Sequence, residues 1–454
     1  MTADWSTYRE LLLPAVSGRR RAVETELRRA VRDGRLTTGT RLPSSRDLAE
    51  QLGVARGTVT AAYAQLVGEG YLTAKRGSGT TVTAAGTWPA DSRTEPDPVP
   101  RWKYDLRPGL PALNAFPRAE WIAAYRAGLA GLSDEELGYP HAAGFPPLRA
   151  ELADYLGRVR AAVTEPEALV ITNGSAEGLS LLCRVLRAQG HRSIAVEEPS
   201  HFGAAEMLAS HGLRVVGVPV DDRGIRVDAL STTDCRVVLV TAAHQFPLGV
   251  VLHPERRHAL IAWARACDGI VIEDDYDAEH RYDRPAFGAV QALDPSRVVH
   301  QGSASKVLAP ALRLGWLVLP ESLRHLVIER KRHDDLGTET LRQAAFTQLL
   351  RGGGYDRHLR RTRALYRKRR DALIDALARE QPSWEPIGVA AGLHVVVRLP
   401  EGTDDLALQR RCAARGVNAV ALAHYVRTPL WPGLVLGYAS LSPDRLREAV
   451  REMR

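Results

Sequence analysis

The sequence predicts a small helix-turn-helix segment followed by a larger α/β unit with a mostly parallel central sheet. Residues 19–68 place apolar side chains at helical spacing and interrupt them with glycine-containing turns. From Asp105 onward, short apolar runs alternate with amphipathic helical stretches, which is typical of strands joined by crossover helices. At 454 residues the chain is too long for one compact core, so we expect two or three domains.

The composition is that of a soluble globular protein, with 45% hydrophobic and 25% charged residues. No apolar run reaches the roughly 18–20 residues of a membrane span, and the N-terminus lacks the pattern of a secretory signal. The cysteines lie far apart without C-x-x-C spacing, which argues against a zinc site and for reduced thiols. We therefore predict a cytoplasmic protein without a metal site.

The net charge of +8 is unevenly distributed along the chain. Residues 1–83 hold 13 Lys and Arg against 8 Asp and Glu, which gives this segment a net charge of +5. A small basic segment joined to a nearly balanced larger one predicts that the small part binds a polyanion.

Three helices and a wing are predicted within this basic segment. The helices are expected at 19–33, 45–52 and 55–68, with Ser44 as the N-cap candidate of the second. The last two are joined by a short turn containing glycine, which is typical of a helix-turn-helix. Residues 70–83 then predict two short strands around a tight glycine turn, which form a wing.

The third predicted helix is the recognition helix, because its N-terminal end would meet base edges in the major groove. Arg56, Thr58 and Thr60 lie at or near that end. Arg46 and Arg76 are expected to contact phosphates or a minor groove. The full set predicted to contact DNA is Ser44, Arg46, Arg56, Thr58, Thr60, Arg76 and Gly77.

A linker is predicted at residues 84–103, which carry four prolines and no apolar periodicity. Such a composition is typical of a semi-rigid, partly extended spacer.

Six apolar runs in the large segment predict strands of a parallel sheet with helices on both faces. They are Val170–Thr172, Ser193–Val196, Arg214–Val218, Val237–Val240, Ile270–Ile272 and Val298–His300. Helices are predicted between them at 176–188, 202–211 and 254–267. In such sheets ligands bind beyond the carboxyl ends of the strands, and the candidate residues fall there.

The stretch G-S-A-S-K-V-L-A-P-A-L-R, residues 302–313, follows the last of these runs. It places Lys306 among small residues, where a lysine can form a Schiff base with an aldehyde. Ser303, Ser305 and Arg313 are suited to binding a phosphate beside it. The ligand that has both an aldehyde and a phosphate is pyridoxal 5'-phosphate.

Two other strand ends support this ligand. Residues 172–177 close a strand and open a helix, so that backbone N–H groups form an anion cradle. Residues 273–277, E-D-D-Y-D, follow a buried run and offer a carboxylate for a pyridinium nitrogen and a Tyr hydroxyl for the ring oxygen. A metal-binding Asp of a nucleotide hydrolase is the competing interpretation, but it requires a G-x-x-x-x-G-K-[ST] loop, which this sequence lacks.

Residues 8–83 resemble the GntR-type winged helix, through L-P-S-S-R-D-L-A-E-Q-L-G-V-A-R-G-T-V-T and the R-G-S-G-T-T-V of its wing. Residues 104–454 resemble a fold-type I, class I aminotransferase. The matching blocks are D-L-R-P-G-L-P-A-L-N-A-F-P, L-G-Y-P-H-A-A-G-F-P-P-L-R, H-Q-F-P-L-G, I-E-D-D-Y-D and G-S-A-S-K, in that order. Together the two parts are similar to the MocR/GabR family of regulators.

This resemblance implies a role for each matched residue. Lys306 would form the Schiff base with pyridoxal 5'-phosphate, Asp274 would hold the pyridinium and Tyr276 would contact its phenolic oxygen, with His244 or Gln245 nearby. Tyr139 would reach the phosphate of the partner subunit, which implies a head-to-tail homodimer. The phosphate contacts within the chain would be Ser175, Ala176, Ser303, Ser305 and Arg313. The resemblance also divides 104–454 into a large subdomain at about 150–330 and a small one at about 331–454.

The sequence departs from the family pattern at two places. His201 stands where an aromatic residue usually stacks on the cofactor ring. The late strand at 433–439, G-L-V-L-G-Y-A, lacks the arginine that binds a substrate carboxylate, so Arg427 is the candidate for an effector carboxylate. The basic stretch 357–370 admits a second DNA-binding face, but the apolar stripe of Leu359 and Leu365 favours a solvated helix with one buried side.

Three functions fit these observations. The chain would be a transcriptional regulator whose aminotransferase-like unit binds an amine or amino acid, a working aminotransferase with an appended DNA module, or a sensor of pyridoxal phosphate itself. The missing carboxylate arginine favours a regulator over an enzyme, while slow half-transamination stays open.

Overall fold

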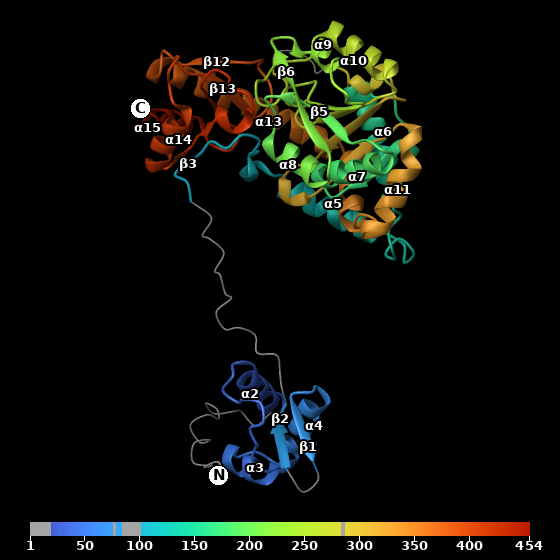
Figure 1. Ribbon diagram of the computed structural model, residues 1–454, viewed down its shortest axis with the longest axis vertical. Coiled ribbons are helices and arrows are strands. Elements are labelled where there is room, and N and C mark those ends of the chain that lie inside the picture. The colour runs from blue at the N-terminus through green and yellow to red at the C-terminus, as the bar shows by residue number, and fades with distance from the viewer. Residues whose placement is uncertain (1–19, 76–78, 84–100, 283–286) are drawn as a thin grey trace. The chain divides into compact units, whose positions relative to one another are not determined.

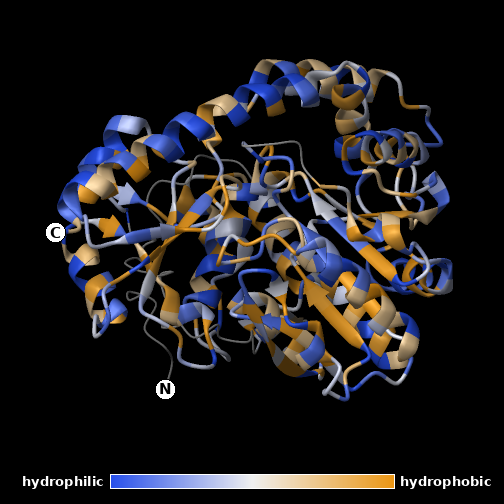
Figure 2. Ribbon diagram, turned by 90° about the horizontal axis from the view of Figure 1, so that it is seen from above, coloured by the Kyte–Doolittle hydropathy of each residue, from blue (hydrophilic) through white to orange (hydrophobic). Residues whose placement is uncertain are grey.

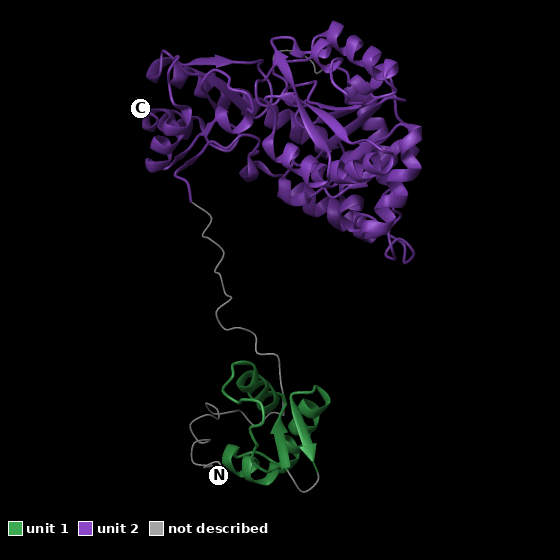
Figure 3. Cartoon of the chain, viewed as in Figure 1, with its two compact units in different colours: residues 1–100 green, residues 101–454 purple. Residues whose placement is uncertain are grey.

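The computed structural model describes residues 20–75, 79–83, 101–282 and 287–454. The chain divides into two compact units, residues 1–100 and residues 101–454 (Figure 3). No helix in the described ranges is both long and apolar enough to cross a membrane.

Within its described residues, the first unit consists of three helices and a two-stranded wing (Figure 1). Ser44 accepts a hydrogen bond from the backbone of Asp47, and Gly53 ends the same helix in a left-handed conformation with φ 64°. Apolar residues of all three helices and both strands share one core. The elements are α2 (Arg20–Arg32), α3 (Ser45–Leu52), α4 (Arg56–Gly68), β1 (Leu72–Lys75) and β2 (Gly79–Val82).

An eight-stranded sheet in the order β4-β11-β10-β9-β8-β5-β6-β7 forms the centre of the second unit. The pairs from β10 through β9, β8 and β5 to β6 are parallel, whereas β4, β11 and β7 pair antiparallel. The strands are β4 (Leu169–Thr172), β5 (Ser193–Glu198), β6 (Arg214–Asp221), β7 (Gly224–Ile225), β8 (Val237–Val240), β9 (Ile270–Asp275), β10 (Val298–Ser303) and β11 (Gly315–Val318). The predicted mostly parallel sheet is therefore confirmed.

Helices cover both faces of this sheet, which explains why its strands read as unbroken apolar runs. Val237 and Leu239 pack toward α7, α8 and α11, whereas Val238 and Val240 pack toward α10. Figure 2 shows the strands in orange among helices that alternate orange and blue. The helices before and around the sheet are α5 (Arg118–Ala130), α6 (Pro146–Arg160), α7 (Ser175–Ala188), α8 (Phe202–Ser210), α9 (Val227–Leu230), α10 (Pro254–Ala266), α11 (Glu321–Asp335) and α12 (Thr340–Arg351).

The chain then leaves the sheet through the long helix α13 (Gly354–Glu380) and builds a second, smaller core. An antiparallel sheet in the order β12-β13-β16-β15 lies in this part, and β14 pairs in parallel with β3 from the start of the unit. The elements are β3 (Tyr104–Asp105), β12 (Glu385–Ile387), β13 (His394–Arg398), α14 (Asp405–Ala414), β14 (Val417–Asn418), β15 (Val420–Ala421), β16 (Gly433–Gly437) and α15 (Pro443–Glu452).

Helix α13 contains the basic stretch 357–370. Leu359 is buried and Leu365 packs against the smaller core, so the predicted apolar stripe holds one side of the helix in place. Arg363, Arg367 and Lys368 on another side line an open groove of about 1060 Å³.

Candidate functional site

Lys306 lies just beyond the carboxyl end of β10 and lines a cavity of about 560 Å³. Its Nζ donates a hydrogen bond to the carbonyl oxygen of Gly109, 2.8 Å away. Burial lowers the pKa of Lys306, while the carboxylates of Asp277 and Asp274 act in the opposite direction. A partly buried amine beside a neutral acceptor is more often uncharged, and therefore more nucleophilic, than an exposed lysine.

Asp274 and Asp275 are neighbours on β9, and their side chains point to opposite faces of the sheet. The Asp275 carboxylate is buried and forms an ion pair with Arg160 at 2.6 Å. Asp274 lines the cavity instead and accepts a hydrogen bond from Nε2 of Gln301 at 3.2 Å. Burial raises the pKa of Asp274 to about 6. Asp274 has no salt-bridge partner in the described chain, so its carboxylate is available to a cation that enters the cavity.

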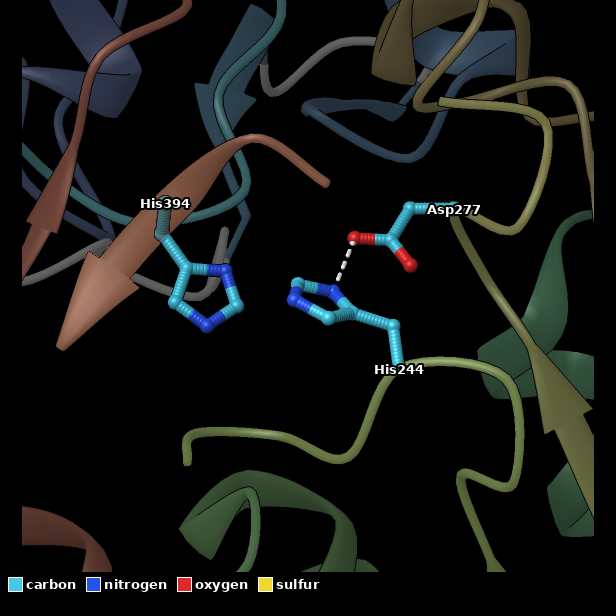
Figure 4. Close-up of side chains that lie close together, drawn as sticks. All are labelled: His244, Asp277 and His394. Carbon is cyan, nitrogen blue, oxygen red and sulfur yellow. Dashed lines mark hydrogen bonds and ion pairs between the residues drawn. The ribbon is translucent and has the colours of Figure 1, made fainter. Parts of the chain in front are cut away.

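Tyr276 also lines the cavity, and its hydroxyl donates to the carbonyl oxygen of His244 at 3.0 Å. His244 is buried, and its Nδ1 lies 2.9 Å from Oδ2 of Asp277 (Figure 4). His244, Asp277 and His394 form a buried group whose potential metal-ligating atoms lie within 4.8 Å of one another. A Cβ on Gly392 would lie 2.5 Å from both His244 Nδ1 and Asp277 Oδ2, so backbone packs directly against the pair. We therefore interpret His244 and Asp277 as a hydrogen-bonded pair that positions the Tyr276 hydroxyl through His244.

The N-terminus of α7 opens on the same cavity, where Ser175 and Ala176 form part of the wall. Gly174 precedes the helix with φ 87°, and its side-chain-free backbone leaves the first N–H groups without a capping side chain. Arg313 reaches this turn and donates from Nη2 to the carbonyl oxygen of Asn173 at 2.9 Å. Free N–H groups, the helix dipole and a guanidinium together make a site for an anion.

Ser303 ends β10 and Ser305 immediately precedes Lys306, and their hydroxyl oxygens lie 2.8 Å apart. The backbone N–H of Ser305 also donates to the Ser303 hydroxyl at 3.1 Å. These two serines and Arg313 are not among the residues that line the cavity. The serines are close to Lys306 in sequence, and Arg313 contacts the turn before α7.

The remaining predicted residues of this unit lie in three different settings. His201 lines the cavity and caps α8, since its Nδ1 accepts a hydrogen bond from the backbone of Ala204 at 3.2 Å. Tyr139 is 89% exposed and is not among the described residues that line the cavity. Arg427 has an exposed side chain outside the cavity wall, and its backbone N–H donates to Glu198.

In the first unit, Arg56 is the first residue of α4, with Thr58 and Thr60 in the same opening turns. The hydroxyl of Thr60 donates to the carbonyl oxygen of Arg56 at 3.0 Å. Arg46 and Arg56 are exposed, and neither forms an ion pair within the parts of the chain that the structure describes. Two predicted contacts in the wing, Arg76 and Gly77, lie outside the described residues.

Two family models match the chain, one in each unit. Residues 19–82 match the gntR family of bacterial regulatory proteins, and residues 111–453 match aminotransferase class I and II. The second model covers most of the chain. The aminotransferase class I and II fold family depends on pyridoxal phosphate.

Curated relatives share both parts. The pyridoxine biosynthesis transcriptional regulator PdxR of Corynebacterium glutamicum is 36% identical, over 94% of this chain and 93% of its own. The probable rhizopine catabolism regulatory protein MocR of Rhizobium meliloti is 32% identical, over 96% and 92%. The chain belongs to the MocR-type regulators. A MocR-type regulator is a transcriptional regulator that joins a GntR helix-turn-helix to an aminotransferase-like unit.

Solved structures resemble the second unit of this MocR-type regulator. A multiple substrate aminotransferase from Thermococcus profundus has a TM-score of 0.70 at 29% identity, over 77% of this chain and 89% of its own. An archaeal alanine:glyoxylate aminotransferase has a TM-score of 0.72 at 27% identity, over 78% and 90%. The predicted fold-type I architecture is thereby confirmed.

Among the residues of the cavity wall that were not predicted from the sequence, three carry a charged or amide side chain. Arg107 comes from the segment after β3, Glu197 from the end of β5 and Gln301 from β10. Burial raises the pKa of Glu197 to about 7, although Thr241 and Gln245 donate hydrogen bonds to it. The sequence feature that could have identified Glu197 is its position at the end of a predicted strand, where ligands bind in such sheets.

Proposed function

We propose that this MocR-type regulator holds pyridoxal 5'-phosphate in the cavity at Lys306 and responds there to an amine or amino acid by changing its binding to operator DNA. One observation carries the proposal: a partly buried amine, a partly buried carboxylate and an uncapped helix N-terminus face the same 560 Å³ cavity. These are the groups that an aldehyde, a pyridine nitrogen and a phosphate require.

Each group would act on a different part of the cofactor. Lys306 would offer its amine to the aldehyde, and Asp274 would hold a proton on the ring nitrogen. Tyr276, supported by His244, would donate to the phenolic oxygen. Ser175, Ala176, Ser303, Ser305 and Arg313 would bind the phosphate, and His201 would lie against the ring. When bound, the cofactor would supply an aldehyde carbon that forms a Schiff base with a primary amine and a ring that withdraws electrons from the carbon carrying that nitrogen.

The DNA contacts are proposed for the first unit. The N-terminal end of α4 would enter the major groove with Arg56, Thr58 and Thr60, while Ser44, Arg46, Arg76 and Gly77 would contact the backbone or the minor groove. Phosphate contacts of this kind predict that affinity falls steeply with salt.

Tyr139 supports the proposal of a homodimer. The residue is 89% exposed, so its ring is available to a partner subunit. In a head-to-tail dimer, Tyr139 would reach the phosphate of the partner subunit.

Slow half-transamination is a second candidate activity, because Lys306, Asp274 and Tyr276 are the groups that a working aminotransferase uses. Membership of a family of transcriptional regulators favours regulation as the main role.

The test measures DNA affinity of the full chain, using fragments selected with the protein itself. With pyridoxal phosphate bound, adding a responsive amine or amino acid should change the dissociation constant for DNA severalfold. This coupling requires that the amine or amino acid bind the DNA-bound and the DNA-free arrangements of the protein with different affinities. Lys306→Ala should abolish that response while its melting temperature stays close to that of wild type. A wild-type affinity that is the same with and without cofactor and amine would overturn the proposal.

A further inference from the structure

Strand β16 offers no cation to the cavity. All five residues of Gly433–Gly437 are buried, and none is charged. Tyr438 follows, and its hydroxyl donates into the interior, to the carbonyl oxygens of Ala391 and Gly392 at 2.9 and 2.7 Å. A carboxylate bound beside Lys306 therefore needs a positive charge from another element.

The end of β16 is closed by the segment that carries Arg107. The backbone N–H of Gly437 donates to the carbonyl oxygen of Leu106 at 2.7 Å. A Cβ on Gly437 would collide with the carbonyl of Arg107. The segment at 106–107 thus occupies the space into which a side chain from this end of the strand would project.

The same segment brings a guanidinium to the cavity wall. Arg107 lines the cavity, and the carbonyl of Gly109, two residues further on, accepts the hydrogen bond from Lys306 Nζ. The Arg107 side chain is 55% exposed, so a ligand can reach it.

Asp105 holds this guanidinium by one edge. Nε of Arg107 lies 3.0 and 2.9 Å from the two Asp105 oxygens, and Nη2 lies 2.6 Å from Oδ2. Asn418 donates to the same carboxylate at 2.9 Å, which fixes Asp105 in turn. Nη1 of Arg107 forms no hydrogen bond with any residue of the described ranges. An arginine held in this way presents its free edge with little loss of side-chain entropy when a carboxylate binds.

We infer that Arg107 binds the carboxylate of the effector, and that the effector is therefore an amino acid rather than a simple amine. The inference rests on the proposed function. Two of the described Lys and Arg residues line the cavity: Lys306 would be committed to the cofactor, and Arg107 is the other.

The experiment titrates the full chain, loaded with pyridoxal phosphate, and follows its visible absorbance. The probes are the common amino acids and the amines that their decarboxylation would give, such as L-alanine with ethylamine and L-phenylalanine with phenethylamine. Wild type is compared with Arg107→Gln and Arg107→Lys. Arg427→Gln is the matched control, because it removes an exposed arginine outside the cavity wall.

Wild type should bind at least one amino acid more tightly than its matched amine. Arg107→Gln should weaken that amino acid about ten-fold or more and leave the amine within about two-fold, since a charge-assisted hydrogen bond is lost only with the carboxylate. Arg107→Lys should retain part of the preference, and Arg427→Gln should retain all of it.

Three results would overturn the inference: no amino acid preferred over its amine by wild type, equal weakening of both probes in Arg107→Gln, or loss of the preference in Arg427→Gln alone. Failure of the proposed function looks different, because wild type would then have no visible band at all.

Discussion

Adjacent residues of β9 show how alternation along one strand separates two roles. Asp275 turns away from the cavity and is neutralised by the buried Arg160, whereas Asp274 faces the cavity and has a raised pKa of about 6. The sequence E-D-D-Y-D marked this strand end, and the choice of Asp274 as the pyridinium partner came from the family resemblance alone. The neighbouring ion pair supports that choice, because it leaves Asp274 as the carboxylate available to a ligand.

Replacing Asp274 should affect cofactor binding, whereas replacing Asp275 should affect stability. Asp274→Asn should weaken pyridoxal phosphate binding at least about ten-fold, because the ring nitrogen loses its ionic partner, and should leave folding intact. Asp275→Asn should lower the free energy of unfolding by about 3–5 kcal/mol, because it removes the direct ion-pair partner of the buried Arg160. Spectral titration and urea unfolding measure the two quantities. Destabilisation by Asp274→Asn with full cofactor affinity would contradict these assignments.

Glu197 should make the stability of the cofactor-free protein depend on pH. Burial raises its pKa from an ordinary value of 4.5 to about 7. The folded state therefore keeps the proton that the unfolded state releases, and stability is lost as pH rises from about 4.5 to 7. Between pH 5 and pH 8, the free energy of unfolding of wild type should fall by up to about 3 kcal/mol more than that of Glu197→Gln.

Urea unfolding followed by tryptophan fluorescence measures that difference at the two pH values. The exposed Glu167, replaced by Gln, serves as the control and should track wild type. A Glu197→Gln variant with the same pH dependence as wild type would show that this side chain titrates normally in the folded state.

At the scale of elements, the N-termini of two helices carry the two proposed binding functions. Helix α7 offers uncapped N–H groups to the cavity, and α4 offers Arg56 at an exposed end. Both helix starts were predicted from the sequence, because a turn with Gly or Ser and a following apolar period mark them locally. What a helix start binds depends on the elements that surround it.

Gly174 should be required for the anion site at α7. Its backbone has φ 87° and ψ 171°, a region that only glycine adopts without strain, and an added Cβ would lie 2.9 Å from Arg313 Nη2. Gly174→Ala should therefore weaken pyridoxal phosphate at least several-fold and lower the melting temperature modestly. Gly190→Ala, at a helix end with open space around it, is the control for left-handed glycines. Equal cofactor affinity in wild type and Gly174→Ala would remove α7 from the phosphate site.

Arg56→Ala should weaken operator binding without changing cofactor affinity. If Arg56 contacts a base, the loss should be about 1–3 kcal/mol and should relax specificity at one position. Arg21→Ala removes an exposed arginine of α2 and should leave operator binding within about two-fold. A footprint of Arg56→Ala identical to that of wild type would contradict the assignment of α4 as the recognition helix.

Across the whole molecule, the sequence predicted local features well and long-range contacts poorly. The apolar runs located six strands of the sheet to within a few residues, because strands buried on both faces read clearly. The approach of Arg107 to the end of β16 joins residues 106 and 437, and no local pattern encodes such a contact. The sequence accordingly predicts Arg427, which is near β16 in sequence, as the carboxylate site, whereas we infer Arg107 from the cavity wall.

The central claim is that one lysine of this regulator forms a covalent bond with the cofactor. Full-length protein saturated with pyridoxal phosphate and reduced with borohydride should, on peptide mapping by mass spectrometry, carry the pyridoxyl group on the peptide that contains Lys306. The Lys306→Ala variant, treated in the same way, should show no such peptide. A saturated and reduced wild-type sample without modification at Lys306 would contradict the account.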